Sequence, residues 1–87
     1  MIETFEKLIR ENIKVDQITI IDRSGQHAGH AGHKSGMHLE ALIVSEDFKD
    51  KSLIERHRMI YSILSDYMSK EIHALSMKTL TKEEINQ

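Results

Sequence analysis

An amphipathic helix is predicted from the segment Phe48-Lys49-Asp50-Lys51-Ser52-Leu53-Ile54-Glu55-Arg56-His57-Arg58-Met59-Ile60-Tyr61. Ser52 is a suitable N-cap, and Glu55 three residues later forms a capping box with it. Apolar side chains then recur at helical spacing, so we expect the helix to run to about Lys70. The expected apolar stripe consists of Leu53, Ile54, His57, Ile60, Ile63, Leu64, Tyr67 and Met68.

Strand patterns lie on both sides of this helix. Residues 14–22 are rich in β-branched side chains, residues 37–45 alternate between two faces, and residues 72–79 are predicted to form a third strand. In the alternating segment, one face carries Met37, Leu39, Ala41 and Ile43, and the other carries His38, Glu40 and Leu42.

Two shorter helices complete the predicted order. Residues 2–12 have apolar side chains at helical spacing, and Thr81 with Glu84 forms a capping box for a short helix over 82–86. The order is helix, two strands, helix, strand, short helix. It predicts a single α+β domain over residues 1–87, in which helices pack on a three-stranded sheet.

Composition narrows the chemistry of the chain. The 87 residues include no cysteine, so the chain can supply neither a thiolate nucleophile nor a thiolate metal ligand. The formal net charge of −2 argues against a domain that holds phosphates by bulk positive charge. No apolar run is long enough for a membrane span, and the N-terminus has no targeting pattern. We therefore expect a soluble, cytoplasmic protein.

Six histidines are the most distinctive feature of this composition. His27, His30, His33 and His38 fall in or just after the glycine-rich stretch 23–36, which we expect to be a long loop between the first two strands. Histidine is the commonest metal ligand among side chains. Alone, this loop is a weak signal, because its His-x-x-His-x-x-His spacing is also typical of adventitious zinc or nickel capture.

Three separated motifs resemble the BolA-like protein family. They are the central segment 48–61, the sequence Ile72-His73-Ala74-Leu75, and the C-terminal Thr79-Leu80-Thr81-Lys82-Glu83-Glu84. Residues 22–30 are similar to the variable loop of that family. The resemblance departs at Asp50, where the family usually has glycine, and Asp is a residue that tolerates the left-handed conformation. Leu39 and Ile85 replace aromatic residues common in the family.

The resemblance implies a fold like the class II KH domain and a non-catalytic role. The family binds monothiol glutaredoxins and shares a [2Fe-2S] cluster with them, in iron–sulfur cluster assembly and trafficking and in iron regulation. Bacterial members are also described as DNA-binding transcriptional regulators of stress responses and cell shape. The identity of the glutaredoxin and the formation of a homodimer stay open.

The resemblance also assigns the cluster ligands. His73 matches the family histidine linked to cluster ligation, and His27 is the best match for the second ligand, with His30, His33 and His38 as competitors. Two imidazoles on one iron would resemble a Rieske centre. A partner glutaredoxin with glutathione would supply the thiol ligands, and the isolated chain would hold no cluster. His57 lies on the apolar stripe and is interpreted as a structural signature.

Nucleic-acid binding is the alternative function. Lys49, Lys51, Arg56 and Arg58 form a local basic group, with the arginines expected on exposed sides of the helix, and this group would suit nucleic acid or an acidic partner. A KH domain clamps nucleotides with a Gly-x-x-Gly loop, and no glycine follows Gly36. No arrangement of nucleophile and base is visible, so the sequence does not favour an enzyme.

Overall fold

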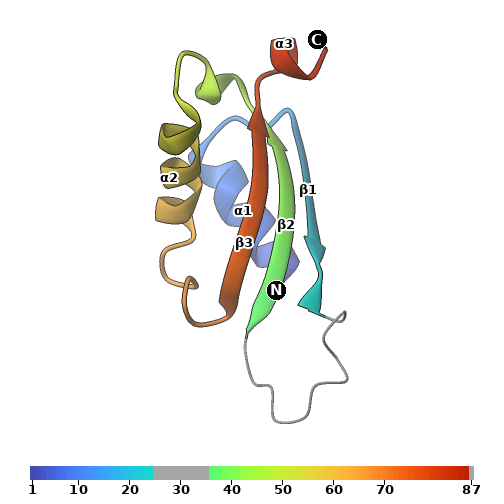
Figure 1. The fold of residues 1–87 in the computed structure, drawn as a ribbon, viewed down its shortest axis with the longest axis vertical. Helices are drawn as coiled ribbons and strands as arrows, with labels where there is room; N and C mark the ends of the chain where they lie inside the picture. Colours follow the sequence, from blue (N-terminus) through green and yellow to red (C-terminus); the bar gives the residue numbers. More distant parts are fainter. Residues whose placement is uncertain (25–35, 87) are drawn as a thin grey trace.

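The computed structural model describes residues 1–24 and 36–86, and the fold is the predicted α+β arrangement. Within these two ranges, three α-helices and the strands of a three-stranded sheet follow one another in the expected order (Figure 1). The elements are α1 (Ile2–Asn12), β1 (Gln17–Asp22), β2 (Met37–Val44), the short 3-10 helix η2 (Glu46–Phe48), α2 (Leu53–Ile63), β3 (Ile72–Leu80) and α3 (Lys82–Ile85).

The sheet has the strand order β1-β2-β3, with β2 at its centre. β1 pairs with β2 in antiparallel register, from Gln17 opposite Val44 to Asp22 opposite Leu39. β2 and β3 are parallel, so the chain must cross over between them, and α2 makes that crossover.

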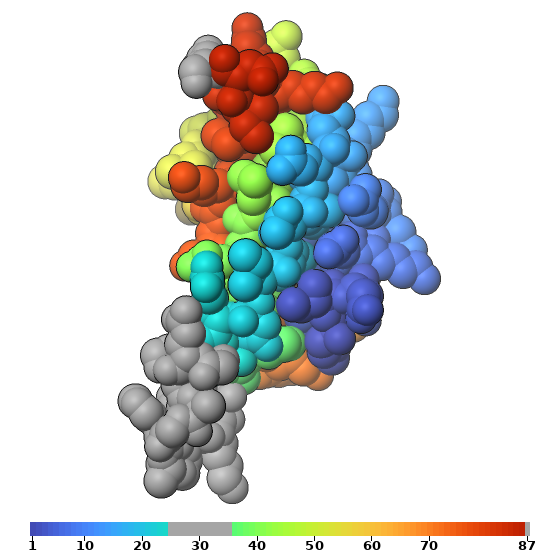
Figure 2. Space-filling model, turned by 90° about the vertical axis from the view of Figure 1, so that its right-hand side faces the viewer, coloured from blue at the N-terminus to red at the C-terminus, as the bar shows by residue number. Residues whose placement is uncertain are grey.

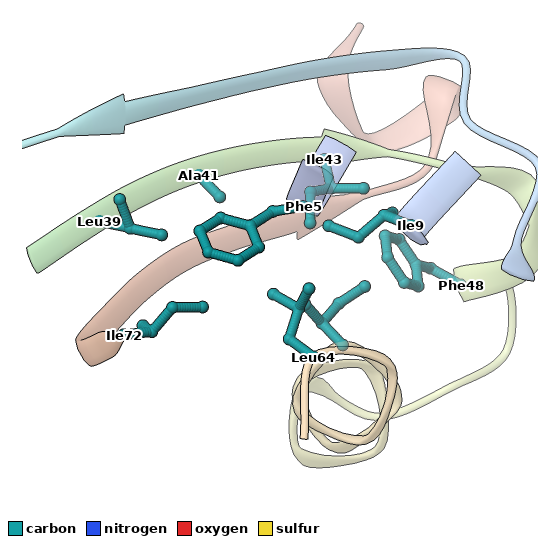
Figure 3. Close-up of a cluster of buried hydrophobic side chains, with 9 residues drawn as sticks. Phe5, Ile9, Leu39, Ala41, Ile43, Phe48, Leu64 and Ile72 are labelled. Atoms are coloured by element: carbon teal, nitrogen blue, oxygen red, sulfur yellow. The ribbon is translucent and has the colours of Figure 1, made fainter. Parts of the chain in front are cut away.

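A single apolar core lies between the sheet and the two longer helices. In Figure 3 the three strands lie on one side of this core and α2 on the other. Its members are Phe5, Ile9, Leu39, Ala41, Ile43, Phe48, Ile60, Leu64 and Ile72. The predicted alternation of β2 is confirmed, because Leu39, Ala41 and Ile43 are buried in this core.

The side chains of β2 that point away from the core lie on the opposite face of the sheet. α1 packs against β1, and α2 packs against β3, both from the core side. Figure 2 shows α1 (blue) against one side of β1 (cyan), while the edge of β1 faces the viewer. Among residues 1–24 and 36–86, no helix packs over most of the sheet face that carries His38, Glu40 and Leu42. We call this sheet face the open face.

Helix α2 is shorter than the sequence predicts. It begins at the Ser52 capping box, as expected, but ends at Ile63 rather than near Lys70. Turns follow, and Ser69 has a positive φ of 65°. Ser65 and Asp66 come directly after the C-cap, and such residues compete with helical hydrogen bonding through their own side chains.

The predicted apolar stripe of α2 is wrong at its first turn. Leu53 and Ile54 are each 62% exposed, whereas Ile60 and Leu64 are buried. The first turn projects beyond the core, and the contact face starts one turn later, at Arg56. No helix of the described residues is long and apolar enough to cross a membrane.

Candidate functional site

Two histidines from different strands lie side by side on the sheet. The ring centroids of His38 on β2 and His73 on β3 are 5.1 Å apart, and the rings are tilted by 34°. His38 is half-buried and His73 is exposed. Both are second residues of their strands, so parallel pairing brings them together at the same end of the sheet.

An irregularity in the pairing contributes to this arrangement. Met37 pairs with Ile72, but His38 pairs with Ala74, so His73 is an extra residue on β3. Such bulges re-aim a side chain that regular alternation would direct elsewhere. Ile72 stays in the core while His73 is exposed next to the ring of His38.

A close backbone approach holds these strand ends together. The Met37 amide donates to the Glu71 carbonyl at 2.8 Å, just before the histidines. A Cβ built on Gly36 would lie 2.7 Å from the Lys70 carbonyl oxygen and still closer to the Glu71 carbonyl oxygen. Real side chains do not reach such distances, so glycine is required at this point.

Three charged residues, Asp22, Arg23 and Glu40, lie near His38. The Arg23 amide donates to the His38 carbonyl at 2.7 Å, and the Arg23 guanidinium lies 3.3 Å from the Glu40 carboxylate. Hydrogen bonds from the Ser24 hydroxyl and amide lower the pKa of Asp22, and the charge of nearby His38 lowers it further.

Comparison with known proteins identifies the family. A family model described as BolA-like protein matches residues 9–84. The chain belongs to the BolA-like family. In this BolA-like chain, the segment Ile72-His73-Ala74-Leu75 forms the start of β3.

Relatives of this BolA-like chain carry several names. It is 34% identical over 82 residues to the DNA-binding transcriptional regulator BolA of Escherichia coli, covering 94% of this chain and 76% of that protein. It is 41% identical over 86 residues to SufE-like protein 1, chloroplastic/mitochondrial, of Arabidopsis thaliana, covering 92% of this chain. The chain spans only 23% of that second relative. Neither name describes an enzyme, and the cytoplasmic location stays a prediction.

Solved BolA structures have the same fold. The BolA domain of SufE1 from Arabidopsis thaliana superposes with a TM-score of 0.81 at 34% identity, over 94% of this chain and 92% of that one. BolA1 from the same plant gives a TM-score of 0.79 at 28% identity, with the same coverage. The predicted fold class is confirmed.

The separation of the two rings would allow both imidazoles to bind one metal ion or one iron of a cluster. Metal–imidazole bonds are about 2 Å long, so two rings at this separation can reach one ion. Two imidazoles leave further coordination positions for ligands from elsewhere. Within residues 1–24 and 36–86, no group of three or more His, Cys, Asp or Glu side chains is arranged to hold a metal.

The predicted ligands are only partly described. His73 and the runner-up His38 are brought together, whereas His27, His30 and His33 lie outside the described residues. The preference for His27 over the other loop histidines therefore stays a prediction. The sequence carried the signal for His38 in its strand alternation, but not its distance from His73.

His57 is half-buried on α2, as expected for a semi-core residue. Its Nε2 atom is buried and has no hydrogen-bond partner among the described residues. Its predicted structural role is compatible with this position and stays a prediction.

The expectation that Arg56 lies on an exposed side of α2 is wrong. Its side chain is buried, with an ion pair of 2.6 Å to Glu84 and a second hydrogen bond of 2.9 Å to the same carboxylate. It also donates to the carbonyls of Thr79 and Lys51 and lies over the Phe48 ring. A guanidinium has five N–H donors in a planar fork, which explains why it is used here.

The rest of the predicted basic group remains on the surface, with Lys49, Lys51 and Arg58 all exposed. Sequence reasoning missed Gly36 as the residue that allows the strand ends to meet, and Glu84 as the partner of Arg56. Glu84 was visible only as a capping residue, a role it also fulfils in the structure.

Proposed function

We propose that this BolA-like protein is a non-catalytic adaptor that binds a monothiol glutaredoxin and shares a [2Fe-2S] cluster with it. The adaptor would serve iron–sulfur cluster assembly and trafficking and iron regulation. The observation that carries the proposal is the pair of imidazoles from His38 and His73, whose centroids are 5.1 Å apart.

The chemistry of the donor set supports a shared group. The chain has no cysteine, so it offers imidazoles and no thiolates. Imidazole ligation on one iron raises the potential of a [2Fe-2S] cluster relative to all-thiolate ligation. The partner and its glutathione would supply the thiolates. Because imidazoles must be neutral to bind metal, acid would favour release.

The structure favours His38 as the second ligand. Its position beside His73 is fixed by strand pairing and by the backbone approach at Gly36. The alternative second ligand, His27, rests on the family resemblance alone. Both assignments predict His73 as a ligand, and they differ in the effect of removing His38.

Spectroscopy of single variants tests this proposal. When the wild-type protein is mixed with a holo monothiol glutaredoxin, the visible absorption and circular dichroism spectra of the glutaredoxin cluster should change. We expect His73→Ala and His38→Ala to abolish the change and His27→Ala to leave it. An unchanged wild-type mixture, or a His73→Ala variant that behaves like wild type, contradicts the adaptor role. Loss with His27→Ala but not with His38→Ala would reassign the second ligand.

DNA-binding regulation is the second candidate, supported by the name of the Escherichia coli relative and by exposed Lys49, Lys51 and Arg58. The use of Arg56 in an internal ion pair weakens it, because that charge is not available to phosphates. Salt-dependent retardation of DNA by micromolar protein, lost in a Lys49→Glu/Lys51→Glu/Arg58→Glu variant, would support it. Absence of retardation at low salt would reject it.

A further inference from the structure

A shallow hollow of about 580 Å³ lies on the open face of the sheet. It extends across all three strands. The side chains that line it from the open face are Thr19 and Ile21 on β1, Glu40 and Leu42 on β2, and Ser76 and Lys78 on β3. Ile21 is 42% exposed.

Among the residues that the structure describes, the charges around this hollow are not balanced. Glu40 is paired with Arg23 at 3.3 Å. Lys78 forms no ion pair with any residue in the described part of the chain. The surface thus offers an apolar centre with a free positive charge on its rim. Its complement is an apolar side chain next to a carboxylate.

The hollow is continuous with the histidine pair. His38 precedes Glu40 by two residues on the same face of β2, and the ring of His73 lies beside that of His38. The other face of the sheet is filled by the core and by α1 and α2. Because the core side is filled, the open face is the side of the sheet on which a protein can add ligands to a group held by both imidazoles.

We infer that the open face is the docking surface for the thiolate-bearing partner, an inference that rests on the proposed function. The partner places an apolar side chain over Ile21 and Leu42 and a carboxylate opposite Lys78, while its thiolates reach the histidine end. A second copy of this chain does not qualify, because a chain without cysteine brings no thiolate.

Charge substitutions on the open face, compared with one on the exposed side of α2, test this inference. Ile21→Glu and Lys78→Glu are titrated with a holo monothiol glutaredoxin, and the apparent Kd is taken from visible circular dichroism. Each should raise the Kd at least tenfold and give the wild-type spectrum at saturation. The matched control is Ile54→Glu, which adds the same charge at an exposed isoleucine on α2 and should change the Kd less than twofold.

Two further measurements keep the outcomes separate. Thr19→Arg blocks the same hollow from an exposed position, so it replaces Ile21→Glu if that variant loses its far-UV circular dichroism. His73→Ala reports on the proposed function itself. If His73→Ala abolishes the mixed spectrum while the open-face variants bind normally, the docking surface is wrong and the adaptor role stands.

Light scattering tests whether a second copy of the chain occupies the open face. We expect the isolated wild-type chain and Ile21→Glu to have the same monomeric mass. A wild-type dimer that Ile21→Glu dissociates would mean that a second copy occupies the face, and would overturn the inference. An Ile54→Glu variant that weakens glutaredoxin binding as much as Ile21→Glu would move the docking surface to α2.

Discussion

His38 and His73 lie on adjacent parallel strands with their ring centroids 5.1 Å apart, and the extra residue at the start of β3 is His73 itself. The pair is not produced by regular alternation, since the partner of His38 in the register is Ala74. The arrangement depends on two backbone features, the bulge at His73 and the close backbone contact at Gly36.

Gly36→Ala should separate the two strand ends. The added Cβ would lie 2.7 Å from the Lys70 carbonyl oxygen and 2.9 Å from the Glu71 carbonyl carbon, so the backbone must move. We expect a loss of about 1–3 kcal/mol in unfolding free energy, as for other overpacked sites, and weaker cluster sharing. Urea unfolding measures the first effect. Lys70→Ala, which removes an exposed side chain and keeps the carbonyl, should change stability by less than about 0.5 kcal/mol.

Arg56→Met should destabilise the fold by about 2 kcal/mol. The substitution leaves the Thr79 carbonyl and part of the Glu84 carboxylate without their donor, and such losses exceed those at exposed ion pairs. Arg58→Met is the control, because Arg58 is exposed and should contribute less than about 0.5 kcal/mol. Equal effects of the two substitutions in urea unfolding would contradict an anchoring role for Arg56.

Acid should weaken the ion pair between Arg56 and Glu84 over a defined pH range. Hydrogen bonds from Arg56 and the Thr81 amide lower the pKa of Glu84 from 4.5 to about 2. A lowered pKa means that the native state favours the ionised form, so the stabilisation is fully present above pH 4.5 and is lost as the pH falls toward about 2. Thermal unfolding of Glu84→Gln should therefore show a lower Tm than wild type near neutral pH. The difference should shrink across this window, and a constant difference would refute the assignment.

Asp50→Gly should stabilise the protein. Asp50 has a φ of 63°, as expected at the position where the family usually has glycine, and this conformation strains any side chain with a Cβ. We expect a gain of about 0.5–1 kcal/mol, with a similar gain for Ser69→Gly at a φ of 65°. Lys51→Gly, at a position without positive φ, should instead lower the urea midpoint.

Ser52→Ala should remove the N-cap of α2 and lower stability. The Ser52 hydroxyl accepts from the Glu55 amide at 3.1 Å, and the Glu55 carboxylate accepts from the Ser52 amide at 2.7 Å. Loss of a serine N-cap costs about 1 kcal/mol. Ser62→Ala, inside the same helix and exposed, should be neutral or slightly stabilising. Comparison of the two urea midpoints therefore separates capping from helix propensity.

The starts of two helices were predicted correctly from short-range sequence patterns. The capping boxes at Ser52 and Thr81 were found from spacing alone, because each involves residues three positions apart. The end of α2 was predicted too late, since apolar side chains at 67 and 68 continue the helical pattern after the helix has ended. In the structure, Tyr67 serves the core differently, packing edge-on against Phe5 at a centroid distance of 5.0 Å.

The sequence predicted that the candidate site uses imidazole ligands, but it only partly predicted which histidines form it. Histidine content and the absence of cysteine predicted imidazole ligands, and the Ile-His-Ala-Leu motif indicated His73. The order of the competing loop histidines could not be read from spacing, because distances within a glycine-rich loop are not set by sequence separation. Arg56 was misjudged for a related reason. Its partner Glu84 is distant in sequence, and a long charged side chain is normally expected in solvent.

The sequence by itself determined the order of helices and strands, the two faces of β2 and the lack of any thiolate, since all of these follow from residue type and short-range periodicity. Only the tertiary structure decided that His38 lies beside His73, that Arg56 forms an internal ion pair, and that a hollow lined by Lys78 lies on the open face. These three depend on parallel pairing, on a bulge and on close packing between segments far apart in the chain. Their distances are set by the folded backbone as a whole.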